Sequence, residues 1–476
     1  MQNTTVAETP ATAIKTPEDA IGMRDKLAYA TGDLGCTMSA ALKSYLSIYW
    51  TQYMGIDSYL MSGLLLVVQV WDAINDPLLG SVIDRDRHVY RRNKFLQYIF
   101  VGSIGLVIAG ALCFMPAPNA PTLVKGVMLV SGYIIWDAFY TMVNVPYGSM
   151  MSLISADPEE RSQLSLWRSV GSMGGGLITG MLVPVLIYDA ADNLRGSWMF
   201  GMALAFGLMG FALLQFTVRN TKIRVAADEG ASRDAVKFSF TGAVRNFTRN
   251  RAVVGASVAS FGQCIGVYGA ATAQQIMFQS YFSAAQLSGV FTMISYLGVF
   301  LFMPLLPTFV ARWGKKRTCA VGAITAMICY ALMAILPIPR NVFGVAIMSV
   351  CMLGATFASA SGTCLNWSFV ADAIDYNEWK FGVRDEGTTY ALSSFCRKLA
   401  QGVAPSAGLA LATYLGYTAS LGAAQTAATA LNMRYLVAGI NVVSAIIQFI
   451  GYGLIFNLDE ATTRQMNAEL AERRAR

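Results

Sequence analysis

Two carboxylates one helical turn apart, Asp72 and Asp76, stand near the end of a long apolar stretch, in the segment WDAINDP at residues 71–77. An ionised carboxylate inside a bilayer is costly unless a partner compensates it, so such residues usually mark an ion or substrate path. Because residues i and i+4 share a helical face, both carboxylates are expected to converge beside the Asn75 amide, and this oxygen-rich set makes Asp72 and Asp76 a candidate Na⁺ site. Alternatively, both lie at a cytoplasmic helix end, which Pro77 indicates is near, and cap it or pair with arginines.

The composition places these carboxylates in a polytopic membrane protein. The chain of 476 residues is 55% hydrophobic and 13% charged, with a mean hydropathy of +0.48. Such a chain has too little polar surface to cover a soluble globule. The net charge of +7 does not indicate nucleic-acid binding, because the Lys and Arg residues lie in short loops rather than on one basic face.

Hydropathy predicts twelve membrane-spanning helices, which gives an all-α fold class. The expected spans are 29–50, 58–80, 95–115, 124–150, 166–188, 198–217, 253–281, 287–309, 318–337, 342–370, 388–415 and 432–456. Basic residues gather in the loops after spans 2, 6 and 8, whereas the loops at 116–123, 282–286 and 416–431 carry almost none. By the positive-inside rule, both termini and the middle loop are expected in the cytoplasm, and the protein in the plasma (inner) membrane.

The longest polar loop divides the spans six and six, which predicts two halves. The expected organisation is a cytoplasmic segment 1–28, an N-terminal half 29–218, a cytoplasmic loop 219–251, a C-terminal half 252–456 and a cytoplasmic tail 457–476. A weak repeat of basic turns, after spans 2 and 8, supports the division. This pattern resembles the major facilitator fold, in which substrate binds between the halves near the midplane.

Several separated motifs indicate a resemblance to one family within this fold. They are KLAYATGD at 26–33, WDAINDP at 71–77, NVPYGS at 144–149, ADAIDYNE at 371–378, VRDEG at 383–387 and Arg397-Lys398. These stretches, in this order, are similar to the signatures of the glycoside-pentoside-hexuronide:cation symporters, the family of melibiose permease. The similarity covers nearly the whole expected transmembrane body.

The resemblance implies two adjacent sites. The Na⁺ or H⁺ site would comprise Asp72, Asn75, Asp76 and Thr141, with Lys398 as a charge that can lean toward it. The sugar site would comprise the faces near Thr37, Tyr140 and Asn144, together with Arg168. Melibiose permease has carboxylates where Thr37 and Asn144 stand and a Trp where Gly148 stands, so the sequence looks more like the glucuronide and xyloside carriers.

The residue chemistry agrees with a sugar cavity. Sugar hydroxyls need donors and acceptors around an apolar ring face. Such groups are supplied by Tyr140, Thr141, Asn144, Arg168, Trp367 and Lys398. The aromatic members, Tyr140 and Trp367, could equally pack or anchor at the interface, as aromatics in membrane helices often do.

Two further charges, Lys43 and Asp137, lie at similar depth in helices 1 and 4, about 9 to 10 Å beyond the expected sugar level. They are expected to pair, with Lys43 snorkelling to the outer interface as the alternative. Because Asp137 shares a helical face with Thr141 and Asn144, it is also a candidate substrate-binding residue.

A gate at the cytoplasmic side is a further expectation. Asp372 and Asp375 face Arg161 and Arg384 as natural partners, and ion pairs between the halves could close the inner side. Such pairs are individually weak, which suits states that must remain close in free energy. Ordinary solvated loop charges are the alternative.

We therefore expect a secondary active symporter that takes up a xyloside, glucuronide or related oligosaccharide with Na⁺ or H⁺. It would work as a monomer in the bilayer, without an organic cofactor, since the sequence has no ATP-binding motif. A lysolipid carrier would need an apolar lateral groove, and a non-transporting sensor would bind sugar without ion dependence. An enzyme would need a nucleophile or metal cluster, which the sequence lacks.

Overall fold

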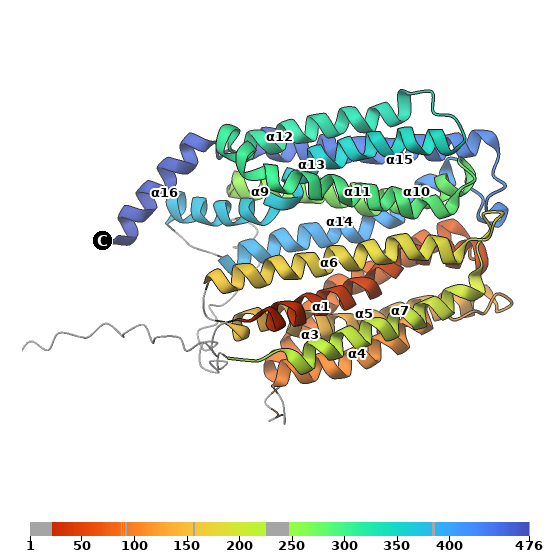
Figure 1. The fold of residues 1–476 in the computed structure, drawn as a ribbon, viewed down its shortest axis with the longest axis horizontal. Coiled ribbons are helices and arrows are strands. Elements are labelled where there is room, and N and C mark those ends of the chain that lie inside the picture. Colours follow the sequence, from red (N-terminus) through yellow and green to blue (C-terminus); the bar gives the residue numbers. More distant parts are fainter. Residues whose placement is uncertain are drawn as a thin grey trace, which may run out of the picture.

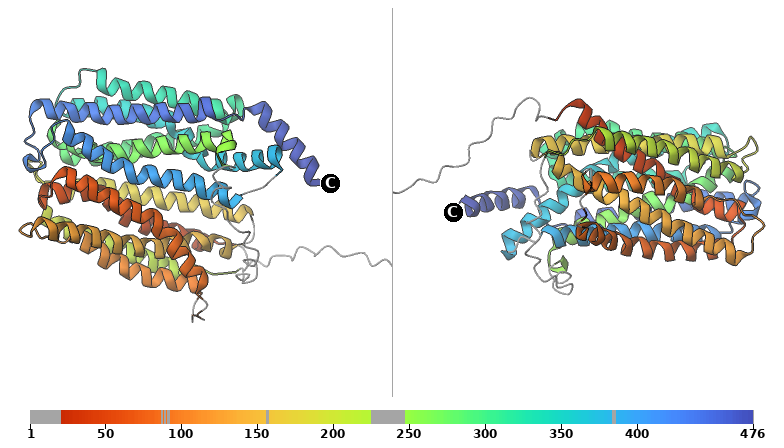
Figure 2. Two further views of the ribbon diagram at one scale, coloured as in Figure 1. Left: turned by 180° about the vertical axis from the view of Figure 1, so that it is seen from behind. Right: turned by 90° about the horizontal axis from the view of Figure 1, so that it is seen from below.

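The computed structural model describes residues 21–86, 88, 90, 93–155, 158–224, 247–382 and 386–475. These residues form a bundle of long helices that run in roughly the same direction or its reverse (Figure 1). The first and last described residues lie at the same end of the bundle (Figure 2).

The first half begins with a broken helix. It comprises α1 (Met23–Ala41), a 3₁₀ turn η1 (Leu42–Tyr45), α2 (Leu46–Ile48) and a π-helical turn η2 (Tyr49–Tyr53). Five longer helices follow, namely α3 (Ser58–Arg85), α4 (Lys94–Cys113), α5 (Thr122–Ile154), α6 (Pro158–Ile187) and α7 (Gly196–Asn220). The Asp57 carboxylate caps α3 by accepting from the backbone N–H groups of Tyr59 and Leu60.

The second half also begins with a broken helix, α9 (Arg251–Cys264), π-helical η3 (Ile265–Gly269) and α10 (Ala270–Ser280). Next come η4 (Ala285–Leu287), α11 (Ser288–Phe302), η5 (Met303–Leu305), α12 (Leu306–Ile335), α13 (Val342–Phe381), α14 (Glu386–Tyr414) and η6 (Ala419–Leu421). The chain closes with α15 (Ala427–Phe449), η7 (Ile450–Ile455) and α16 (Glu460–Ala475).

The helix α12 contains a sharp change of direction at Gly314, where φ is +74°. Only glycine adopts this conformation readily, so the eighth span ends here and the ninth begins. With α12 divided at Gly314 and each broken helix taken as one, the described chain contains the twelve expected spans. The expected boundary at 309–318 therefore corresponds to a tight basic turn rather than to a loop.

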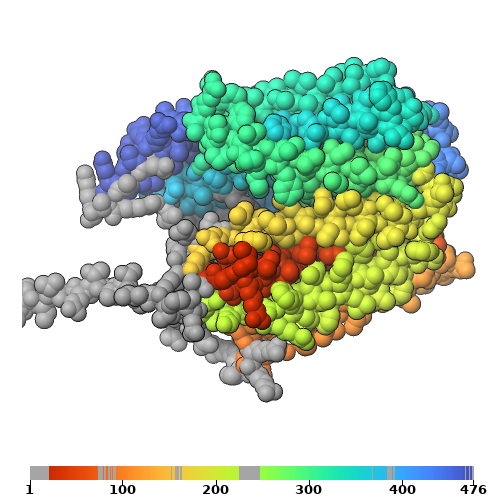
Figure 3. Space-filling model, viewed as in Figure 1, coloured from red at the N-terminus to blue at the C-terminus, as the bar shows by residue number. Residues whose placement is uncertain are grey.

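Helices pack mainly within each half. In the first half α1 lies against α6 and α7, and α4 lies against α5 and α7; in the second half α12 lies against α13 and α15. The halves meet where α3 contacts α14 and where α6 contacts α11, and these contacts form the seam between them. Figure 3 shows the second contact, where yellow α6 lies against green α11. At this seam a Cβ on Gly289 would lie 2.9 Å from the Gly180 carbonyl oxygen, so glycine permits the close approach.

The surface of the bundle suits a bilayer. Eight helical stretches of the described chain are long and apolar enough to cross a membrane. Large apolar side chains such as Val67, Ile108, Val267 and Val350 are exposed on the sides of the bundle. The end of the bundle that carries Lys94, Arg219 and the basic turn after Gly314 is called the basic end below, and the opposite end is called the far end.

Candidate functional site

A buried hydrogen-bonded set joins α3 to α5 inside the first half. The Asn75 Nδ2 group donates to Asp137 Oδ2 at 2.9 Å and to Thr141 Oγ1 at 3.1 Å. Asn75, Asp137 and Thr141 are 3%, 1% and 1% exposed, so water does not solvate these polar groups. The family resemblance implied the meeting of Asn75 with Thr141, whereas Asp137, predicted to face substrate, bonds to the same amide.

Asp72 belongs to the same cluster. Its carboxylate lies close enough to Asp137 to interact with it electrostatically. The second Asp137 oxygen, Oδ1, is buried without a hydrogen-bond partner. Asp137 is buried and Asp72 is half-buried. Two neighbouring carboxylates of this kind favour a proton or a cation beside them, so this cluster has the chemistry of a cation or proton site. The side chain of Asp76, the fourth predicted member, lies outside the described side chains.

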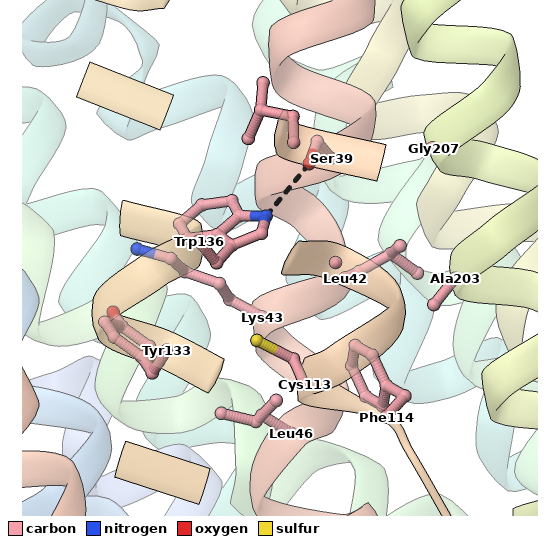
Figure 4. A pocket seen from close by; sticks show the side chains of 12 residues that line it. Ser39, Leu42, Lys43, Leu46, Cys113, Phe114, Tyr133, Trp136, Ala203 and Gly207 are labelled. Atoms are coloured by element: carbon pink, nitrogen blue, oxygen red, sulfur yellow. Dashed lines mark hydrogen bonds between the residues drawn. The ribbon is translucent and has the colours of Figure 1, made fainter. Parts of the chain in front are cut away.

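Lys43 extends from η1 into a cluster of aromatic rings (Figure 4). Its ammonium lies 4.2 Å from the ring centroid of Trp136, 4.6 Å from that of Tyr133 and 5.9 Å from that of Tyr140. The Trp136 indole in turn donates to Ser39 Oγ at 3.1 Å. Lys43 therefore points inward to α5 and does not snorkel.

The predicted pair of Lys43 and Asp137 is not a direct ion pair among the described side chains. The ammonium is instead within electrostatic range of both Asp72 and Asp137 while it sits over the rings. Equal depth on neighbouring helices was the basis of the prediction, and it did not account for the three aromatic side chains that α5 presents along the same face. A cavity of about 20 Å³ beside Lys43, room for one water molecule, is lined by Ser39, Tyr133 and Trp136 among others.

The second half faces this cluster through α14 and η3. Lys398 of α14 lies within electrostatic range of Asp72 and of Lys43. Tyr268 of η3 likewise lies within range of Lys43, and of Tyr140. The acidic cluster is thus next to the seam between the halves, as a coupling site must be if the halves are to respond to its occupancy.

Arg168 has a partner that sequence reasoning did not assign. Its Nε lies 3.6 Å from Asp33 Oδ1, and its guanidinium lies 5.1 Å from the Tyr147 ring centroid. Tyr147 stacks on Tyr29, with ring centroids 4.7 Å apart, and each hydroxyl donates to the other residue's backbone carbonyl. Asp33 is the last residue of the KLAYATGD motif at 26–33, within the first helix, so the sequence carried a signal for this residue.

Of the remaining predicted sugar-site residues, some contact other side chains of the protein and one has no hydrogen bond within the described part. The Thr37 hydroxyl is 3.1 Å from Ser172 Oγ of α6, so it joins two helices. Tyr140 stacks on Trp136 with ring centroids 5.0 Å apart. Asn144 is half-buried and makes no hydrogen bond within the described part of the chain, and the Trp367 side chain lies outside that part.

Asp372, predicted to take part in a gate between the halves, pairs with Lys315. The Lys315 ammonium bonds both Asp372 oxygens, at 2.9 and 2.7 Å, so this ion pair lies within the second half and does not bridge the halves. The kink at Gly314 turns Lys315 toward α13, which explains the pairing. Burial raises the pKa of Asp372, and Lys315 opposes the rise. Asp375 lies one turn further along α13, and the side chains of Arg161 and Arg384 lie outside the described ones.

The far end carries a bridge between the halves that the sequence did not suggest. Gln52 and Gln279 exchange amide hydrogen bonds of 2.7 and 3.1 Å, and Gln52 also donates to the Tyr417 hydroxyl at 2.9 Å. Gln279 donates to the backbone carbonyl of Asp192, whose carboxylate accepts from the Ala285 N–H at 2.7 Å. These contacts hold the far end of the two halves together.

Comparisons with known proteins agree with this arrangement. A family model described as MFS/sugar transport protein matches residues 28–460. The chain is 29% identical over 461 residues to the Uncharacterized symporter YjmB of Bacillus subtilis (strain 168), over 96% of this chain and 97% of that protein. It is 27% identical over 444 residues to the isoprimeverose transporter of Lactiplantibacillus pentosus, over 90% and 88% of the two chains. It is also 25% identical over 405 residues to the glucuronide carrier protein homolog of Escherichia coli (strain K12), over 84% and 85%.

Among solved structures, the inward open conformation of the xylose transporter XylE from E. coli superposes with a TM-score of 0.61. The sequence identity is 13%, with 93% of this chain and 98% of that chain covered, so the likeness shows the fold. Together with the family match over nearly the whole chain, it establishes the architecture expected from the twelve spans. The chain belongs to the MFS/sugar transport protein family, resembles the glycoside-pentoside-hexuronide symporters, and is a membrane transporter rather than an enzyme.

Proposed function

We propose that this transporter takes up a glycoside together with a cation by alternating access, in the plasma (inner) membrane with both termini in the cytoplasm. The observation that carries the proposal is the buried set of Asn75, Asp137 and Thr141 beside Asp72, next to the seam between the halves. Carboxylates kept in such a place are expensive to retain without a transport task. Relatives named as a symporter, an isoprimeverose transporter and a glucuronide carrier homolog support it.

The cation would bind at Asp72, Asn75 and Thr141, with Asp76 and Asp137 as further carboxylates. Na⁺ would be held by carboxylate and hydroxyl oxygens, and a proton would be shared between the carboxylates. In either case occupancy removes net negative charge beside Lys398, which belongs to the other half. A charge change at the seam alters the relative free energies of the two orientations, which is the basis of coupling.

The sugar would bind between the halves, against Arg168, Tyr140 and Asn144 of the first half and Lys398 and Trp367 of the second. A half-buried guanidinium and amide beside aromatic rings provide the mixed polar and apolar surface that sugars require. Asp33 neutralises Arg168 in part, which favours hydroxyl recognition over tight binding of a strongly anionic ligand. The family of substrates we propose is therefore xylosides and related glycosides, with glucuronides bound through Lys398.

Alternating access would use the two broken helices. The far-end bridge joins these two helices, with Gln52 in the π-helical turn η2 and Gln279 near the end of α10, which follows the π-helical turn η3. Helix irregularities of this kind often mark functional hinges. If the neutral amide bridge breaks and the basic end closes, the sugar site would become accessible from the far end instead of the basic end.

A carrier of an amphipathic substrate such as a lysolipid is the second candidate. An apolar groove of about 450 Å³ runs between α14 and α15 over η3, and its described lining contains no charged residue. Val403, Leu411, Tyr435 and Val443 of this groove are between 39% and 49% exposed, so the groove opens on the side of the bundle. It matches the lateral groove such a substrate needs, but it lies away from the acidic cluster and offers no partner for a headgroup.

Uptake into right-side-out membrane vesicles tests the proposal. A radiolabelled xyloside, a glucuronide, melibiose and a lysophospholipid are compared under an inward Na⁺ gradient, an inward proton gradient and no gradient. We expect gradient-driven accumulation of the xyloside or glucuronide and poor uptake of melibiose. Accumulation of the lysophospholipid alone would favour the second candidate, and uptake that no ion gradient changes would contradict symport.

A further inference from the structure

Lys43 is a positively charged side chain inside the helix bundle, and the proposed transport cycle gives it no role. Its ammonium lies among membrane helices, over the rings of Tyr133, Trp136 and Tyr140. Cation–π contacts contribute modestly, and a charge in such a place also needs a counter-charge. Among the described residues, the negative charges in range are the carboxylates of Asp72 and Asp137, and the Lys398 ammonium of the other half is also in range.

The carboxylates of Asp72 and Asp137, in turn, need a positive charge near them. Asp137 is 1% exposed, and its Oδ1 is buried without a partner while Oδ2 accepts from Asn75. Asp72 lies beside it and repels it when both carboxylates are ionised. The amide of Asn75 orients Asp137 but supplies no net positive charge. The nearest positive charge from the same half is the Lys43 ammonium.

Lys43, Asp72 and Asp137 all lie in the first half, so the ammonium stays near the two carboxylates throughout the transport cycle. Lys43 lies in the first helix, Asp72 in α3 and Asp137 in α5, and these helices belong to the six-helix unit that moves as one body in alternating access. Lys398, by contrast, belongs to α14 of the other half, so its distance from Asp72 changes during the cycle. Only the Lys43 charge accompanies the carboxylates in both orientations, among the described residues of this cluster.

We propose that Lys43 is a tethered counter-cation for Asp72 and Asp137, which supplies the positive charge that Na⁺ would otherwise supply, so that this chain does not bind Na⁺. This inference deepens the proposed function and rests on it, because it leaves the proton as the coupling ion. Na⁺ would need several oxygen ligands in the space next to the ammonium and would be repelled by it at full charge. A proton instead forms an O–H bond on one carboxylate, and the ammonium then balances the other. Removal of the ammonium would leave two carboxylates, a hydroxyl and an amide oxygen, a ligand set that suits Na⁺.

The test is direct binding of ²²Na⁺ to the purified full chain in detergent, in choline chloride at constant ionic strength and pH 8. The wild type is expected to show no saturable binding below about 50 mM, a range in which a Na⁺ site coupled to transport would fill. Lys43→Met is expected to gain one saturable site, and Lys43→Met combined with Asp137→Asn is expected to lose it. Lys125→Met is the matched control, because Lys125 is a buried lysine that donates to the Met54 carbonyl, away from the cluster.

Two results would overturn the proposal. One is saturable Na⁺ binding by the wild type in the range where it is expected to show none, and the other is no gain of binding in Lys43→Met that remains folded by size-exclusion chromatography. If Lys43→Met does not fold, Lys43→Gln takes its place. Na⁺ binding by the wild type would overturn the proposal even if neither variant folds. Since binding is measured without sugar, a wild type that binds Na⁺ refutes only the counter-cation, whereas failure of gradient-driven uptake refutes symport.

Discussion

The Asn75 amide donates to the Asp137 carboxylate at 2.9 Å, and this bond joins α3 to α5 at the centre of the acidic cluster. A buried carboxylate that loses a hydrogen-bond donor keeps its full desolvation penalty. The bond therefore positions Asp137 and also determines how stable the first half is when no cation is bound.

Removal of the Asn75 amide should destabilise the protein, because the buried Asp137 carboxylate loses its hydrogen-bond donor. Asn75→Ala is expected to lower the free energy of unfolding by about 1–3 kcal/mol, the range for a buried group left unsatisfied. In an Asp137→Asn background the same change should cost clearly less, because the two side chains act on each other. Thermal unfolding in detergent measures both effects.

Asn441→Ala is the control for that experiment, since the Asn441 amide is also buried but donates only to the neutral Val437 carbonyl. A loss in Asn75→Ala no larger than that in Asn441→Ala, and unchanged by Asp137→Asn, would show that the Asp137 charge is not supported by Asn75.

Asp33 should determine the preference between neutral and anionic sugars. Its carboxylate lies 3.6 Å from the Arg168 guanidinium and neutralises part of its charge. Asp33→Asn is expected to strengthen glucuronide binding by about tenfold, equivalent to about 1.4 kcal/mol, with a smaller change for a neutral xyloside. Competitive binding of the two ligands gives the ratio, and equal changes for both would refute this role.

The far-end bridge should favour the closed far end by a small amount. Gln279→Ala removes neutral hydrogen bonds to Gln52 and to the Asp192 carbonyl, each worth about 0.5–1.5 kcal/mol. We expect faster hydrogen–deuterium exchange over residues 284–292, which lie at this end of α11. Gln425→Ala serves as the control, because the Gln425 amide bonds only within its own loop. Similar exchange in the two variants would mean that the bridge does not hold the halves together.

Lys315 and Asp372 should act as a structural pair of the second half. Lys315→Gln leaves a partly buried carboxylate without its partner, and the midpoint of thermal unfolding is expected to fall. Lys315→Gln combined with Asp372→Asn should recover most of the loss, with little change in uptake rate. A double variant that is stable but transports several-fold faster or slower would instead indicate a gate.

The sequence predicts the helices and their charge asymmetry well, because hydropathy and basic loops depend on composition alone. The resemblance to the symporter family also implied that Asn75 and Thr141 share a site, and the helical rise placed Lys43 and Asp137 at one depth. Lys43 and Asp137 lie within electrostatic range but form no direct ion pair among the described side chains, since the ammonium lies over the rings of Tyr133 and Trp136, whose orientation follows from helix packing.

Other contacts had no signal in the sequence. Gln52 and Gln279 are neutral, lie in different halves and are separated by 227 residues, so neither hydropathy nor charge marks them as a pair. The pairing of Asp372 with Lys315 depends on the chain reversal at Gly314, a backbone conformation that the basic motif alone does not specify. These features follow from tertiary packing rather than from local pattern.

Gradient-driven uptake by Asp72→Asn is the most direct test of cation coupling at the acidic cluster. In vesicles with an imposed inward proton gradient, the wild type is expected to accumulate the xyloside or glucuronide above its external concentration. Asp72→Asn should equilibrate the same sugar and exchange it, but should not accumulate it, because the amide can neither share a proton with Asp137 nor change charge. Full concentrative uptake by Asp72→Asn would contradict the account.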